Sequence, residues 1–89
     1  MLKPRELERI IKGASNHRRI QILELIKKQP ELSVFEIADD LDINYKTASE
    51  HIRRLAIAGL VMKRSAGRDV RHALTDRGNI ILTFLRTLE

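Results

Sequence analysis

The chain has 89 residues, of which 43% are hydrophobic and 33% charged, which predicts one small globular domain over residues 1–89 and excludes a disordered chain. Its formal net charge of +5 and pI of about 10.1 predict attraction to polyanions. It contains no cysteine, which excludes disulfides, thiolate chemistry and cysteine-based metal sites.

A first amphipathic helix is expected at residues 4–12. Pro4 suits the first position of a helix, where its missing amide is no loss, and Gly13 predicts the end. The helix presents an apolar face that so small a domain does not cover by itself. That face consists of Leu7, Ile10 and Ile11.

A second helix is expected between a cap at Asn16 or Ser15 and about Gln29, because Pro30 stops it. Its apolar residues cover more than one face, which predicts a central place in the core. Three basic residues open this helix, namely His17, Arg18 and Arg19. Positive charge is unfavourable at a helix N-terminus, so these residues are either solvated or in contact with a phosphate, and both interpretations stay open.

Residues 33–58 have the pattern of a helix-turn-helix. Ser33 and Glu36 form a capping box ahead of a short amphipathic helix. After a turn of about three residues, Asn44 caps a second helix that Gly59 ends. Two short capped helices joined by so tight a turn predict a motif whose second helix recognises DNA.

This second helix has an apolar back and a polar, mostly cationic front. Ala48, Ile52 and Leu55 fall on one stripe at helical spacing and should face the core. A charged front is often only a solvated face, but the basic hairpin that follows favours DNA. The candidate contacts are Asn44, Tyr45, Lys46, Thr47, Ser49, Glu50, Arg53 and Arg54. Glu50 either accepts from a cytosine amino group or only pairs with an arginine of the same helix.

After Gly59 the period changes to that of two strands at residues 60–74, with turn residues around Gly67 between them. A hairpin directly behind a recognition helix predicts a wing. Its candidate DNA contacts are four cations, Lys63, Arg64, Arg68 and Arg71. Alternatively, these charges only protect the strand edges against aggregation.

The last expected helix covers residues 76–88 after a cap at Thr75 and has a second uncovered apolar face. This face consists of Ile81, Phe84, Leu85 and Leu88. It either folds back on the core or meets a partner. Together with the face of the first helix, it predicts a homodimer joined through the terminal helices.

Several motifs of the chain resemble those of the ArsR/SmtB group of transcriptional regulators. The resemblance covers roughly residues 16–78 and is carried by Arg19–Ile26, Leu32–Leu41, Thr47–Leu55 and Ala58–Val61, while Leu74–Gly78 also occurs in MarR-like regulators. It implies a winged helix-turn-helix fold, mainly α with a small β-hairpin. It also implies a homodimer that joins through its first and last helices.

One departure from this group concerns metal regulation. Metal sensors of the group use a cysteine pair in the third helix or Asp, His and Glu sets on the last helix, and neither set is present here. His17, His51 and His72 have no ligand spacing, and a packed or capping role is expected for His51. We therefore expect no metal and no cofactor. Regulation without an effector, by another ligand or by a protein partner all stay open.

Two functions from different classes fit these features. The first is a sequence-specific regulator that binds double-stranded DNA as a homodimer, and the second is a winged helix that only binds proteins. A basic helix front and a basic wing together favour DNA. No arrangement of nucleophile, base and acid predicts an enzyme. No apolar run suits a membrane span, and the start lacks the apolar centre of a signal peptide, so a soluble cytoplasmic protein is expected.

Overall fold

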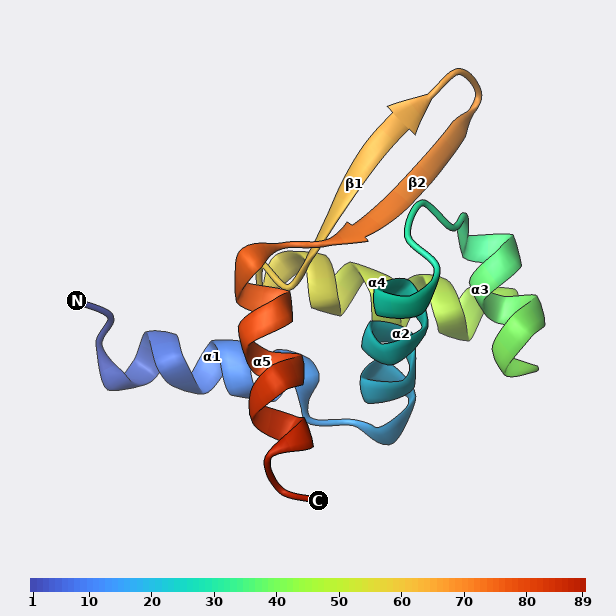
Figure 1. Ribbon diagram of the computed structural model, residues 1–89. Coiled ribbons are helices and arrows are strands. Elements are labelled where there is room, and N and C mark those ends of the chain that lie inside the picture. The colour runs from blue at the N-terminus through green and yellow to red at the C-terminus, as the bar shows by residue number, and fades with distance from the viewer.

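The computed structural model describes residues 1–89 as five helices and one two-stranded antiparallel sheet (Figure 1). The elements are α1 (Pro4–Ala14), α2 (His17–Lys28), α3 (Val34–Leu41), α4 (Tyr45–Ile57), β1 (Val61–Ala66), β2 (Asp69–Leu74) and α5 (Asp76–Arg86). The predicted order of helices and hairpin is confirmed. None of the helices combines the length and apolarity that crossing a lipid bilayer requires.

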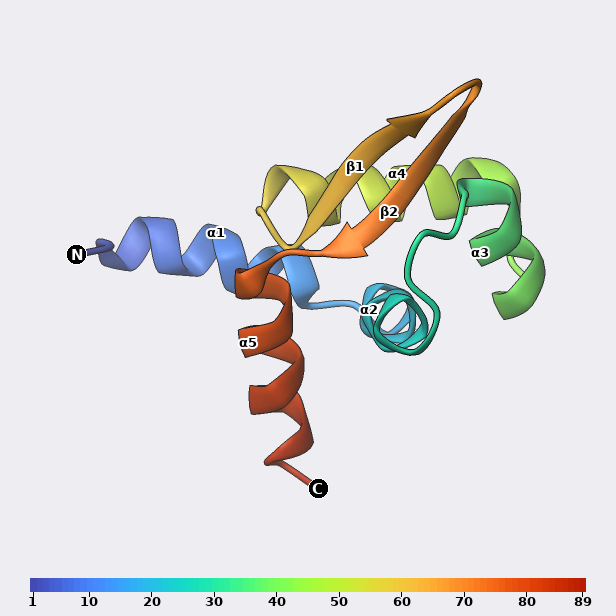
Figure 2. The same ribbon diagram turned by 45° about the horizontal axis from the view of Figure 1, so that its top comes forward.

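Helix α2 lies at the centre of the molecule. Figure 2 looks nearly along its axis and shows the other helices and the hairpin arranged around it. Ile22, Leu23 and Ile26 of α2 are at most 1% exposed, as the prediction of a central helix requires. They share one apolar core with residues from the other elements, among them Ile37, Ile52, Leu55, Leu60 and Leu82. Burial of these side chains is the main force that holds the helices together.

The first helix is longer than predicted. Gly13 was expected to end it, yet α1 continues to Ala14 and Gly13 is buried inside it. A Cβ atom on Gly13 would lie 2.3 Å from the Cβ of Ala58, closer than two carbons can approach. The glycine therefore serves close packing against the end of α4 and does not terminate the helix.

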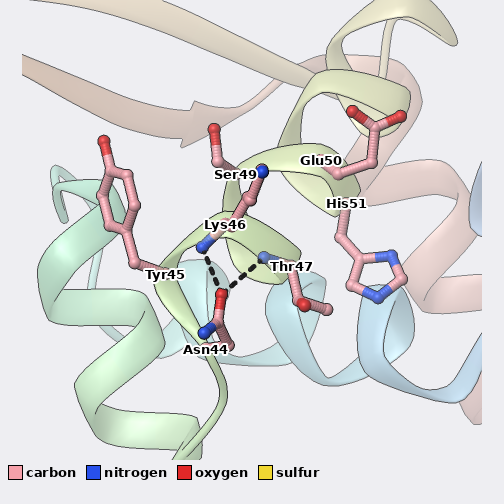
Figure 3. A pocket seen from close by; sticks show the side chains of 7 residues that line it. All are labelled: Asn44, Tyr45, Lys46, Thr47, Ser49, Glu50 and His51. Atoms are coloured by element: carbon pink, nitrogen blue, oxygen red, sulfur yellow. Dashed lines mark hydrogen bonds between the residues drawn. The ribbon is translucent and has the colours of Figure 1, made fainter.

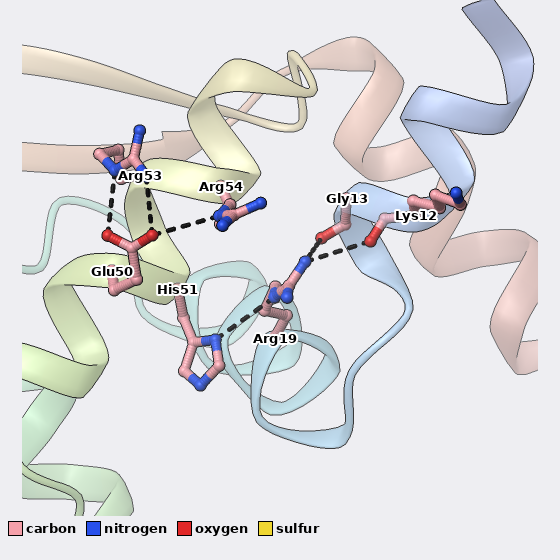
Figure 4. A network of polar contacts seen from close by, with 7 residues as sticks. All are labelled: Lys12, Gly13, Arg19, Glu50, His51, Arg53 and Arg54. Carbon is pink, nitrogen blue, oxygen red and sulfur yellow. Dashed lines mark hydrogen bonds and ion pairs between the residues drawn. The ribbon is translucent and has the colours of Figure 1, made fainter. Parts of the chain in front are cut away.

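Arg19 has a role that neither sequence interpretation anticipated. Its guanidinium donates to the carbonyl oxygens of Lys12 and Gly13 at 3.1 and 3.0 Å, and its Nε donates to Nδ1 of His51 at 3.3 Å (Figure 4). The last carbonyl oxygens of a helix have no hydrogen-bond donor within the helix, and Arg19 is the donor for two of them at the end of α1. It thereby joins α1, α2 and α4, and His51 has the packed role expected of it.

The predicted caps of the helix-turn-helix are confirmed. The hydroxyl of Ser33 accepts from the amide of Glu36 at 3.2 Å, and the Glu36 carboxylate accepts from the amide of Ser33 at 2.9 Å. The side chain of Asn44 accepts from the amides of Lys46 and Thr47 at 2.7 and 3.3 Å. At the end of α4, Gly59 has φ +76°, the left-handed conformation that glycine adopts without strain.

The hairpin pairs Val61 with Leu74 at its base and Ala66 with Asp69 at its turn. Two contacts that the sequence did not indicate attach it to the body. Leu32 forms an isolated antiparallel bridge with His72, and the hydroxyl of Thr75 donates to the Gly59 carbonyl at 2.5 Å. The wing is therefore fixed at its base, on the α2–α3 loop and on the end of α4.

Helix α5 ends at Arg86, two residues earlier than predicted, so Leu88 lies beyond the helix. Its first turn approaches the chain just before β1 closely. Gly78 is buried there, and a Cβ atom on it would lie 2.1 Å from the carbonyl oxygen of Leu60. As at Gly13, a glycine permits backbone contact between two elements.

Candidate nucleic-acid interface

Helix α4 has the two faces that the sequence predicted. Its stripe of Ala48, Ile52 and Leu55 is at most 1% exposed. The opposite side borders an open hollow on the surface, lined by Asn44, Tyr45, Lys46, Thr47, Ser49, Glu50 and His51 (Figure 3). Tyr45, Ser49 and Glu50 point to one side of the helix, whereas Thr47 and His51 point to a different side (Figure 3). The structure thus gathers most of the candidate helix contacts on one exposed surface.

Glu50 is engaged within its own helix (Figure 4). The Arg53 guanidinium donates to both carboxylate oxygens of Glu50, at 2.7 and 3.0 Å, and Nε of Arg54 donates to one of them at 3.2 Å. Hydrogen bonds from Arg53, and then from Arg54, lower the pKa of Glu50 to about 2. The carboxylate is therefore ionised near neutral pH and partly neutralises both arginines, as in the pairing interpretation.

The four predicted wing cations fall into two groups. Arg64 forms an ion pair with the Glu31 carboxylate at 2.5 Å. Arg71 donates to the Glu31 carbonyl oxygen at 3.1 Å and to the Asp69 carboxylate at 3.2 Å. The side chains of the other two cations, Lys63 and Arg68, are exposed and make no hydrogen bond or ion pair. Half of the wing charge is thus already paired within the chain.

The sequence missed two residues of this surface. One is Glu31, whose backbone has φ +72°, a left-handed conformation that is uncommon for a residue other than glycine. The other is Phe35, whose ring stacks on that of Tyr45 with centroids 4.5 Å apart. Phe35 lies off the apolar stripe of α3, so its position on the outer face could have been predicted from the sequence. The partner of Glu31 lies more than thirty residues away, and no sequence signal indicates it.

Four of the seven apolar residues predicted for a dimer interface, Ile11, Ile81, Phe84 and Leu85, line one hollow. Leu7, Ile11, Phe84 and Leu88 are between 48% and 68% exposed, and Ile10, Ile81 and Leu85 are half-buried. An apolar hollow joins the two helices, and its lining consists of Ile11, Ala14, Ser15, Ile20, Ile81, Phe84 and Leu85. The apolar faces of α1 and α5 therefore meet at this hollow.

The histidines are not arranged as metal ligands. No group of three or more His, Cys, Asp or Glu side chains is close enough to hold a metal ion. His72 is fully buried, with Nδ1 2.8 Å from the carbonyl oxygen of Leu32. Burial, and after it the charge of Arg19, lowers the pKa of His51.

Comparisons with known proteins agree with this geometry. The model of the bacterial regulatory protein arsR family matches residues 16–63. A homodimeric winged helix-turn-helix DNA-binding domain from Mycobacterium bovis superposes with a TM-score of 0.85 at 27% identity, over 93% of this chain and 77% of that one.

Two curated relatives are longer than this chain. The chain is 39% identical to an uncharacterised protein of Methanocaldococcus jannaschii over 71% of its own length and 23% of the relative's. It is 29% identical to a cadmium resistance transcriptional regulatory protein CadC homolog of Staphylococcus aureus, over 82% of its own length and 60% of the relative's. The chain thus spans less than two thirds of either relative.

The name of the second relative raises the question of a metal. Soft metal ions prefer thiolate ligands, and this chain has no cysteine and no cluster of other ligands, so its residues do not fit such a site. The match to the family model is independent of this difference. Because that match covers more than half of the chain, the chain belongs to the arsR family of bacterial regulatory proteins.

Proposed function

We propose that the chain is a sequence-specific, double-stranded DNA-binding transcriptional regulator that acts as a homodimer. The observation that carries the proposal is the exposed front of α4, whose back is buried and whose C-terminal end leads into a basic wing. An α-helix fits the major groove, and residues of its first turns reach base edges. The similarity to a homodimeric DNA-binding domain of Mycobacterium bovis supports the same function.

In this proposal the two elements have different tasks. Tyr45, Lys46 and Ser49 of α4 approach bases or phosphates in the major groove. On the wing, the unpaired Lys63 and Arg68 meet the backbone or the minor groove, where cations add affinity by releasing counterions without reading much sequence. The other residues predicted to contact DNA remain in the proposal as secondary contributors to DNA binding, namely Asn44, Thr47, Glu50, Arg53, Arg54, Arg64 and Arg71.

The regulatory family and the site give no sign of catalysis, so we propose that the chain is not an enzyme. We also propose that it acts in the cytoplasm, where its DNA would be accessible. Neither proposal depends on the identity of an effector.

Selection of bound fragments from random duplexes, at a stated salt concentration, tests the DNA-binding function. In a dimer the two α4 helices would enter grooves about 34–36 Å apart, so we expect a palindrome with that half-site spacing. Equal affinity for all duplexes, or footprints on single asymmetric half-sites, would contradict the proposal.

Sedimentation of the unmodified chain tests the homodimer. Exposed apolar side chains of α1 and α5 meet at one apolar hollow, and such patches mark interaction surfaces, so we expect dimers. Phe84→Ser should weaken them, because Phe84 lines the apolar hollow. Ile57→Ser is the matched control, since Ile57 is 71% exposed on α4 and lies outside that hollow. A stable monomer of the unmodified chain would remove the dimer from the proposal.

A variant of Glu50 separates the two interpretations of that residue. Glu50→Gln removes the carboxylate that binds Arg53 and Arg54, and it frees both cations. If pairing is its only role, affinity should rise or hold for every duplex. Loss of preference at a single base position would instead identify Glu50 as a reader of cytosine.

A further inference from the structure

None of the three aromatic residues of the chain lies in its core. This is unusual for a small domain, because aromatic side chains bury the largest apolar areas and normally dominate a core. Phe84 belongs to the proposed dimer surface. The other two, Phe35 and Tyr45, stack on each other at the surface, and the proposed dimer does not account for their exposure.

The Phe35–Tyr45 pair, meaning these two stacked rings, is accessible and ordered by local contacts. Phe35 is 70% exposed and Tyr45 is 47% exposed. Their centroids are 4.5 Å apart with planes tilted by 30°, an arrangement in which each ring restricts the other. Phe35 occupies the second position of α3 and Tyr45 the first position of α4. The pair thus bridges the beginnings of both helices of the motif.

The pair continues the proposed DNA-reading surface. Tyr45 lines the same hollow as Lys46 and Ser49, and Phe35 of α3 stacks on Tyr45 beside it. The neighbouring acid, Glu36, accepts a hydrogen bond from the amide of Ser33. Its charge is therefore directed back toward the capping box of α3. The aromatic pair is therefore an apolar contact point with the cation Lys46 beside it.

In duplex DNA the faces of the bases are stacked, so a ring on a protein surface meets base edges only. The one strongly apolar group on those edges in the major groove is the 5-methyl of thymine. We propose that the Phe35–Tyr45 pair packs against one thymine methyl in each half-site and so determines sequence preference there. This inference rests on the proposed function, because it needs α4 in a major groove. It adds Phe35 to the specificity-determining residues.

Replacing each thymine of the selected duplex by deoxyuridine, one at a time, tests the inference because it removes only the methyl group. The unmodified chain should bind about fourfold more weakly at one position of each half-site, the effect of one buried methyl group. Phe35→Ala should bind the thymine and uracil forms of that position equally well. Phe35→Leu, which keeps an apolar side chain, should retain part of the difference.

Ile57→Ala is the matched control, because Ile57 is 71% exposed near the other end of α4. It should keep the full sensitivity to uracil. Both substituted residues are exposed, and thermal unfolding should show that the variants remain folded.

A selected site at which no uracil substitution weakens the unmodified chain overturns the inference and leaves the proposed function standing. Uracil sensitivity that survives both Phe35→Ala and Tyr45→Ala also overturns it, because the methyl contact then belongs to a residue outside the pair. A chain that prefers no duplex at all overturns both the inference and the proposed function.

Discussion

His72 should make the stability of the fold depend on pH. This residue of β2 is fully buried, and its Nδ1 donates to the Leu32 carbonyl, which leaves Nε2 without a partner. Burial, and to a lesser degree the charge of Lys63, lowers the pKa of His72. The hydrogen bond to Leu32 acts in the opposite direction, and burial outweighs it. The folded chain therefore contains the neutral ring near neutral pH.

The sign follows from proton linkage. An unfolded histidine takes up a proton near its ordinary pKa of about 6.5, whereas the folded one does so only at lower pH. Stability is thus complete above about pH 6.5 and is lost as pH falls from there toward the lower pKa of the folded state. One proton gives a limiting slope of about 1.4 kcal/mol per pH unit. For a domain of this size, that corresponds to a fall in the unfolding temperature of about 5–10 °C per pH unit.

Thermal unfolding followed by circular dichroism, at one protein concentration and at several pH values between about 7.5 and 5, measures this slope. His72→Asn retains a donor for the Leu32 carbonyl and does not titrate. The variant should be less stable, because it loses ring volume, and its unfolding temperature should vary less with pH. His51→Asn serves as the comparison, since the pKa of His51 is also lowered. If His72→Asn keeps the full slope, the assignment to His72 is wrong.

Two further substitutions test close contacts elsewhere. Gly78→Ala should destabilise the fold by about 1–3 kcal/mol in urea unfolding, because the new Cβ would lie 2.1 Å from the Leu60 carbonyl oxygen. Helix propensity alone predicts that alanine at this position stabilises the fold. A more stable variant would therefore contradict the close contact between Gly78 and Leu60. Glu31→Gln should free Arg64, raise affinity for every duplex and steepen the salt dependence by about one unit. Glu8→Gln changes the net charge equally on α1, and an equal effect there would show that only net charge matters.

Short-range signals made most of the helix-turn-helix predictable. The capping box of Ser33 and Glu36 and the cap at Asn44 use hydrogen bonds that span two or three residues, so their spacing in the sequence nearly determines their geometry. For the cap of α2, the sequence did not decide between Asn16 and Ser15. The structure selects Asn16, whose side chain accepts from two amides of α2.

Long-range contacts were not predictable for a corresponding reason. Arg19 and His51 are separated by 32 residues, and His72 and Leu32 by 40. A charged or imidazole side chain in the sequence does not indicate which distant carbonyl or ring it will meet. Glycine shows the same limit, because Gly59 marks a helix end by its backbone conformation, whereas Gly13 marks a tight contact inside a helix.

The joint between α1 and α4 has a consequence for operator geometry. Gly13 lies against Ala58, and Arg19 ties the end of α1 to His51, so we expect these helices to move as one rigid body. In the proposed dimer, the surface that joins the protomers would then fix the separation and the relative rotation of the two α4 helices. One inserted base pair shifts a half-site by about 3.4 Å and turns it by about 34–36° around the DNA axis. With no hinge at this joint, the deformation would fall on the DNA spacer, whose flexibility then becomes part of what the protein selects.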